Sequence, residues 1–244
     1  MDIAAKQPFP QWRFLQLTVA IVAWLLISPH IDSRFGGHIA MHVLLFDLLL
    51  VTIWANPQWR RFGRVVWALW GISLVASTLS ILDATPQWRQ LERTVDVALI
   101  APVTIACIVG VLDFVFRAER PTVDGIFAMV VVYLLIAIVF AELYYLLIVW
   151  NHESLRLLQP VAEMQPRELR SELMYYSLVT ISTVGYGDVL PVSPAARTIA
   201  TVEAVAGQFY VAVVVATFVA MYTTHRLALR SGAAAVRKPT PTDD

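Results

Sequence analysis

Six consecutive residues in the C-terminal half have the types and spacing to bind a bare cation: Thr183, Val184, Gly185, Tyr186, Gly187 and Asp188. A backbone that aims successive carbonyl oxygens at one axis can replace the water around an ion. Ordinary L-residues resist the dihedral angles that such a backbone needs, whereas the two glycines adopt them because they have no Cβ. The hydroxyl of Thr183 adds an oxygen at the inner end of the row. The stretch therefore predicts a row of oxygen ligands for a dehydrated cation.

This hexapeptide resembles the selectivity filter of the potassium channel family, and its flanks resemble the same pore. Residues 175–182 are similar to the pore helix that precedes the filter. Residues 190–194 and Arg197 are similar to the outer mouth, and Gly207 falls where many members have a hinge glycine in the inner helix. The alternative is a glycine turn between two apolar segments, which would suit a bare G-x-G better than six matching residues.

The resemblance implies a role for each residue around the filter. The carbonyls of Thr183, Val184, Gly185 and Tyr186 coordinate K⁺, and Gly187 closes the row. The expected filter supports are Asp188, Tyr175, Tyr176, Val179 and Thr180. Either tyrosine hydroxyl can donate to Asp188, at positions where the family often has Trp. Some members carry a Glu where this chain has Val179, so their Glu–Asp pairing is not expected here.

The last apolar stretch is expected to line the cavity below the filter. Its candidate lining residues follow one helical face, at the spacing of neighbouring turns: Gln208, Val211, Val215 and Val219. The resemblance implies a polar ring from the glutamine and a gate in which the valines expel water. Packing against lipid or other helices is the alternative. Gly207 is the candidate hinge, because this stretch has no Pro-x-Pro bend.

Composition indicates a polytopic membrane protein. The chain is 58% hydrophobic and 15% charged, with a mean hydropathy of +0.66. Zero formal net charge gives no argument for a nucleic-acid partner, and a single cysteine excludes an intrachain disulfide. Stretches of membrane-spanning length lie at about 12–28, 38–55, 65–82, 95–116, 123–150 and 195–224. Backbone groups in lipid must be satisfied internally, so these are expected to be helices.

The predicted fold is an all-α membrane protein with six transmembrane helices and a re-entrant pore helix and selectivity filter between the fifth and sixth. The pore helix is expected within 166–182. Residues 1–121 form a four-helix transmembrane domain, 122–226 a pore domain, and 227–244 a short cytoplasmic tail that is too small for a regulatory module. With both termini cytoplasmic, 11 basic residues lie inside and seven outside. Arg outnumbers Lys 16 to 2, which weakly indicates a prokaryotic plasma membrane.

Six spans with the pore between the last two resemble voltage-gated channels, but the fourth stretch departs from that pattern. A voltage sensor needs several positive charges inside the membrane field. The stretch from Val95 to Asp113 has no Arg or Lys. We therefore expect weak or no intrinsic voltage dependence.

Acidic residues inside apolar stretches are costly unless paired, so each needs an explanation. The candidates are Asp47 near His42, Asp96, Asp113, Glu142 and Glu203. Asp96 and Asp113 lie near span ends, where interfacial water can solvate them. A metal or proton site at Asp47 and His42 is a weak hypothesis, because residues five apart share a helical face poorly. Glu142 is expected to pack against a polar partner in the pore domain, the alternative being a role in gating; a pH sensor at Glu142 or Glu203 is also considered.

The sequence as a whole predicts a homotetrameric, potassium-selective channel that conducts passively in a lipid bilayer, because one filter per chain requires four chains. No phosphate-binding loop, metal-ligand cluster or nucleophile–base pair is recognisable, so neither an enzyme nor a cofactor other than permeant K⁺ is expected. The alternatives are a voltage-gated channel with an atypical sensor, a non-conducting regulatory or structural subunit, and an ion-coupled transporter. The gating stimulus, the resting state and the role of the first four helices stay open.

Overall fold

The computed structural model describes residues 12–27, 36–55, 60–82, 86–117, 122–224 and 227. The first part of the chain consists of α1 (Arg13–Ile27), α2 (Gly36–Ala55), α3 (Arg60–Leu82) and α4 (Pro86–Arg117). The second part contains α5 (Val123–Trp150), β1 (Leu155–Arg156), the 3₁₀ turn η3 (Val161–Glu163), α6 (Pro166–Ile181), β2 (Leu190–Pro191), α7 (Pro194–Phe209) and the π-helix η4 (Tyr210–Val215). Helices therefore occur at all six predicted stretches and at the predicted pore helix.

Three of these helices are long and apolar enough to cross a membrane. Within the described residues they are Val97–Arg117, Val123–Trp150 and Pro194–Thr224. The last of these runs through α7, η4 and the turns that follow. Shorter apolar helices occupy Arg13–Ile27, His42–Ile53 and Gly63–Val75. The structure is thus a mostly helical protein with membrane-length helices, and the crossing of all six stretches stays a prediction.

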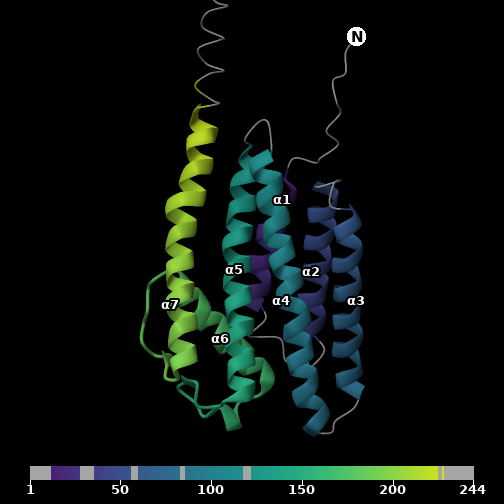
Figure 1. Ribbon diagram of the computed structural model, residues 1–244, viewed down its shortest axis with the longest axis vertical. Helices are drawn as coiled ribbons and strands as arrows, with labels where there is room; N and C mark the ends of the chain where they lie inside the picture. The colour runs from purple at the N-terminus through teal and green to yellow at the C-terminus, as the bar shows by residue number, and fades with distance from the viewer. Residues whose placement is uncertain are drawn as a thin grey trace, which may run out of the picture.

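Helix α5 is shared by the two parts of the fold. The long helices run side by side, with α5 between α7 and the group formed by α1 to α4 (Figure 1). α5 packs against α1 and α4 on one side and against α6 and α7 on the other. Its mostly apolar sequence fits this position, since side chains as far apart around it as Val131, Val132 and Ala137 are all 0% exposed.

One hydrogen-bonded contact joins the first helix to the start of α5. The Asp124 carboxylate accepts from the backbone N–H groups of Phe14 and Leu15 at 3.1 and 3.3 Å. The first N–H groups of a helix have no partner within it, and an Asp side chain is a preferred acceptor for them. In the same turn, Thr18 Oγ1 lies 3.3 Å from the carbonyl oxygen of Phe127. Asp124 of α5 therefore caps α1.

The segment before α6 is tied to the segment after the filter. β1 and β2 pair antiparallel, with Leu155 opposite Pro191. The Val192 N–H donates to the carbonyl oxygen of Ser154 at 2.9 Å. This short ribbon fixes the outer end of α7 relative to the outer end of α5.

Candidate ion-conduction site

Helix α6 begins sharply and leads the chain to the filter. Pro166 occupies its first turn, and Gln165 and Glu168 form a capping box in which the Gln165 N–H donates to Glu168 Oε2 at 3.0 Å. At the other end, the carbonyls of Leu178, Val179 and Thr180 accept bonds from the residues that follow. The filter is therefore a continuation of the helix's own hydrogen bonding.

The filter backbone has a positive φ at every second residue: 60° at Thr183, 58° at Gly185 and 81° at Gly187. In an ordinary strand, successive residues face opposite sides. A residue with left-handed backbone conformation at every second position disrupts this alternation. The two glycines occupy the conformations expected of them. The positive φ of Thr183 was not predictable from its residue type, because a β-branched residue rarely adopts positive φ. Such strain persists where the surroundings hold it and is typical of functional sites.

Backbone hydrogen bonds hold the inner end of the filter against α6. The carbonyl oxygen of Val179 accepts from the N–H groups of Val184 and Gly185 at 3.0 and 3.4 Å. The carbonyl oxygen of Thr180 accepts from the Thr183 N–H at 2.9 Å. Val179 and Thr180, two of the predicted supports, thus contact the filter through their backbone carbonyls. Such contacts do not depend on side-chain type and could not be predicted from it.

Tyr175 and Asp188 hold the outer end. The tyrosine hydroxyl donates to Asp188 Oδ2 at 2.5 Å, and its ring stacks on Tyr186 with centroids 6.5 Å apart and 3° between the planes. This hydrogen bond lowers the pKa of Asp188 and raises that of Tyr175 to about 12. Partial burial, and then the charge of Asp188, raise the pKa of nearby Glu172. The expected tyrosine–aspartate bond is present, with Tyr175 as the donor.

The second predicted tyrosine lies elsewhere. Tyr176 is buried and packs edge-on against Tyr144 of α5, with centroids 4.9 Å apart. It therefore supports the back of α6 and does not donate to Asp188.

An ion pair fastens the start of α6 to α5. Arg170 Nη1 lies 3.0 Å from Glu142 Oε1, and these side chains are 21% and 8% exposed. The same guanidinium lies 4.4 Å from the centroid of the Tyr145 ring. Glu142 thus has the polar partner in the pore domain that the sequence analysis expected.

Glu203 of α7 is buried where α5, α6 and α7 meet. Its carboxyl group contacts Ser177 Oγ through Oε1 and accepts from the Tyr144 hydroxyl through Oε2 at 2.7 Å. Ser177 Oγ also lies 2.7 Å from the carbonyl oxygen of Ala137. Glu203 was a candidate from sequence, but its partners were not predictable, because residues 26 and 59 positions away leave no periodic signal.

Gly207 of α7 lies close against Ile181 at the end of α6. A Cβ built on Gly207 would clash with the carbonyl oxygen of Ile181 and lie 2.6 Å from its Cγ1. The same carbonyl accepts from the Tyr133 hydroxyl at 3.1 Å. Close packing is therefore a reason for glycine here, independent of the hinge that the resemblance implies.

The predicted cavity face is only partly regular. Gln208, Val211 and Val219 are exposed in the single chain, and Gln208 Nε2 lies 3.5 Å from Thr183 Oγ1, longer than an ordinary hydrogen bond. Val215, in contrast, packs against the hydrophobic core. The regular α-helical spacing that placed these residues on one face does not hold, because residues 210–215 form the π-helix η4.

The remaining predicted residues lie away from the filter. Asp47 is exposed on α2, while His42 of the same helix is buried beside Trp70. Asp113 pairs with Arg117 one turn later at 2.5 Å, and the side chain of Asp96 is outside the described residues. No group of three or more potential metal-ligating side chains occurs among the described residues.

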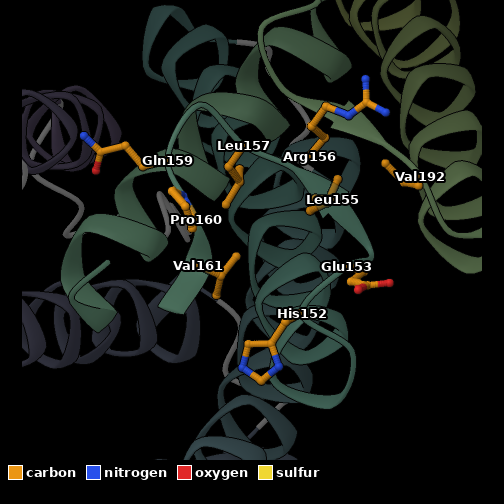
Figure 2. A pocket seen from close by; sticks show the side chains of 9 residues that line it. All are labelled: His152, Glu153, Leu155, Arg156, Leu157, Gln159, Pro160, Val161 and Val192. Carbon is orange, nitrogen blue, oxygen red and sulfur yellow. The ribbon is translucent and has the colours of Figure 1, made fainter. Parts of the chain in front are cut away.

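The surface also has an open hollow of about 460 Å³, lined by residues between His152 and Val161 and by Val192. His152, Glu153, Arg156 and Gln159 lie around it, but their polar ends point in different directions, as Figure 2 shows. Binding sites for small molecules usually have a few convergent polar groups. The hollow therefore lacks the arrangement of polar groups that is typical of a binding site, and the filter stays the candidate functional site.

Comparison with known proteins finds similarity in the part of the chain that contains the candidate site. A family model described as an ion channel matches residues 128–224, from α5 through α6 and the filter to the end of the inner helix. No curated protein and no solved structure is significantly similar to the chain. Residues 1–127 lie outside the match. The filter, its supports and Glu203 all belong to a segment that matches ion channels.

Proposed function

We propose that four copies of this chain form a potassium-selective channel that conducts K⁺ passively across a membrane, with weak or no intrinsic voltage gating. The observation that carries the proposal is the positive φ at Thr183, Gly185 and Gly187 within a TVGYGD sequence, in a segment that matches ion channels. In the proposed pore the carbonyls of residues 183–186 replace the hydration shell of K⁺.

Exposure in the single chain supports a tetramer. Residues 182–187 are exposed, and an apolar window in Pro194–Thr224 is 17% buried, against 50% for α5. Side chains such as Phe209 and Val211 are 65% and 51% exposed. Four chains around one axis would place the filters and inner helices against each other, as a single-filter subunit requires.

Two further parts of the proposal concern gating and placement. α4 has no Arg or Lys between Arg93 and Arg117, which supports weak voltage dependence. The basic residues favour cytoplasmic termini in a plasma membrane, with the filter at the outer face. A steep conductance–voltage relation in symmetric potassium, with blocking cations removed, would contradict the first point.

The decisive experiment is potassium flux from liposomes that contain the purified protein, with sodium in place of potassium for comparison. We expect potassium flux that barium blocks and that Gly185→Ala abolishes, because a Cβ at φ 58° strains the filter. Gly71→Ala is the matched control, since a Cβ on this helical glycine would have no heavy atom within 4 Å. Equal sodium and potassium flux, or undiminished flux in Gly185→Ala, would refute the proposed selectivity. A verified tetramer with no flux would favour a non-conducting subunit.

A further inference from the structure

Glu203 of α7 is buried between α5 and α6. This side chain is 0% exposed, and its two oxygens contact hydroxyl groups on two different helices. Oε1 contacts Ser177 of α6 and Oε2 accepts from Tyr144 of α5. Glu203 is thus the point at which the inner helix meets both neighbouring helices.

Counting protons at Ser177 indicates which group donates. Ser177 Oγ is within hydrogen-bonding distance of two oxygens, Glu203 Oε1 and the carbonyl oxygen of Ala137. A hydroxyl has a single proton to donate, and a carbonyl oxygen can only accept. If Glu203 were ionised, one of these two buried contacts would have no proton between its oxygens. If Glu203 carries a proton on Oε1, it donates to Ser177, Ser177 donates to Ala137, and Tyr144 donates to Oε2, so that every contact is satisfied.

The surroundings of Glu203 also favour the neutral acid. The ionisable groups that interact with it are the phenols of Tyr133 and Tyr144 on α5 and Tyr176 on α6. In the described part of the chain, the groups that act on the Glu203 carboxyl are Ser177 and Tyr144, and no Lys, Arg or His is among them. A buried carboxylate without a cation is costly. Glu142, by comparison, lies 3.0 Å from the Arg170 guanidinium.

We propose that Glu203 is protonated and acts as a positioning residue, donating a hydrogen bond to Ser177 so that the inner helix α7 holds the pore helix α6 and, through Ser177, α5. The role in conduction rests on the proposed function, whereas the protonation state does not. Ser177 lies two residues before Val179, whose carbonyl oxygen accepts from Val184 and Gly185. Loss of the Glu203 proton would remove its hydrogen bond to Ser177. It would also leave a buried negative charge close to Val179, which supports the filter.

Infrared spectroscopy of the whole protein in liposomes tests the protonation directly. A protonated carboxylic acid has its own carbonyl stretching band, distinct from that of a carboxylate. We expect wild type at neutral pH to have such a band, Glu203→Gln to lack it, and Glu142→Gln, the matched control, to retain it. Ser177→Ala should shift the band, because it removes the acceptor of the acid proton. The proposal would be overturned if wild type and Glu203→Gln had the same spectrum in the region of the carboxylic acid band. It would also be overturned if Ser177→Ala left the position of that band unchanged.

The positioning role has a separate readout in the pH dependence of potassium flux. The flux of wild type should fall as alkaline pH abolishes the band, whereas Glu203→Gln should give a flat profile over that range, because its amide N–H replaces the acid O–H as donor. A fall in both proteins over the same pH range would overturn the positioning role. A protein with the predicted band but without potassium flux would refute the proposed function and leave the protonated Glu203 standing.

Discussion

Gly207→Ala distinguishes close packing from a hinge, because the structure gives the cost of the added methyl group. In a helix, replacing Gly by Ala contributes about 1 kcal/mol of stability through backbone propensity alone. At Gly207 the methyl would meet the backbone carbonyl of Ile181, which cannot rotate away, and Ile181 Cγ1 at 2.6 Å. Overpacking of this kind costs about 1–3 kcal/mol. Gly71→Ala gains the same propensity without the clash.

The two variants should therefore differ by about 1–3 kcal/mol in free energy of unfolding. For a chain of this size, that corresponds to a melting temperature about 2–12 °C lower for Gly207→Ala than for Gly71→Ala. Thermal unfolding of the purified proteins, followed by loss of helical circular dichroism, measures the difference. A hinge without close packing predicts equal melting temperatures and a change in flux alone. Equal stability of the two variants would therefore refute the packing argument.

Three further changes test individual contacts. Tyr175→Phe removes the donor that lowers the pKa of Asp188. This carboxylate favours the fold above its pKa and loses that effect as pH falls through it, so acid inhibition of potassium flux should move to higher pH. Arg170→Met should destabilise by about 3 kcal/mol, because it removes the cation that lies 3.0 Å from the nearly buried Glu142 carboxylate, and adding Glu142→Gln should recover much of the loss in thermal unfolding. Asp124→Ala should cost about 1 kcal/mol through loss of the α1 cap, also seen in thermal unfolding.

Each change has a control or a contradicting result. Tyr176→Phe should leave the acid inhibition in place, since Tyr176 does not donate to Asp188, and an equal shift in both variants would contradict the assignment. Additive effects of the Arg170 and Glu142 substitutions would show that their ion pair contributes nothing. If Asp124→Asn, which keeps an acceptor oxygen, is as destabilised as Asp124→Ala, the cap is not the cause.

Helix positions were predictable from sequence because apolar runs of membrane length, bounded by Pro and charged residues, leave little choice. The fifth predicted stretch coincides with α5, Val123–Trp150, and α6 lies within the predicted 166–182. The positive φ at Gly185 and Gly187 was predictable from residue type, while the assignment of a selectivity filter stays a prediction. These features depend on neighbours in sequence, which a single sequence displays directly.

Contacts between helices were beyond the sequence, because they depend on rotation and register that periodicity does not fix. Glu142 was expected to have a polar partner, but the sequence did not identify Arg170 as that partner. The π-helix η4 has no distinctive composition, so the valines were placed on a regular face that the structure interrupts. Thr183 adopts positive φ against its own preference, which reflects the surrounding hydrogen bonds and not its residue type.

The cap that α5 provides to α1 bears on how separable the pore is from the helices before it. A fragment starting at residue 122 would retain Asp124 but lose the backbone groups of Phe14 and Leu15 that it binds. It would also open the face of α5 that α1 and α4 cover. α5 therefore belongs to the packing of both groups of helices, and removing the first group would leave one face of α5 uncovered. The contacts of α1 and α4 with α5 therefore predict that the segment from residue 122 onward is less stable without the helices that precede it.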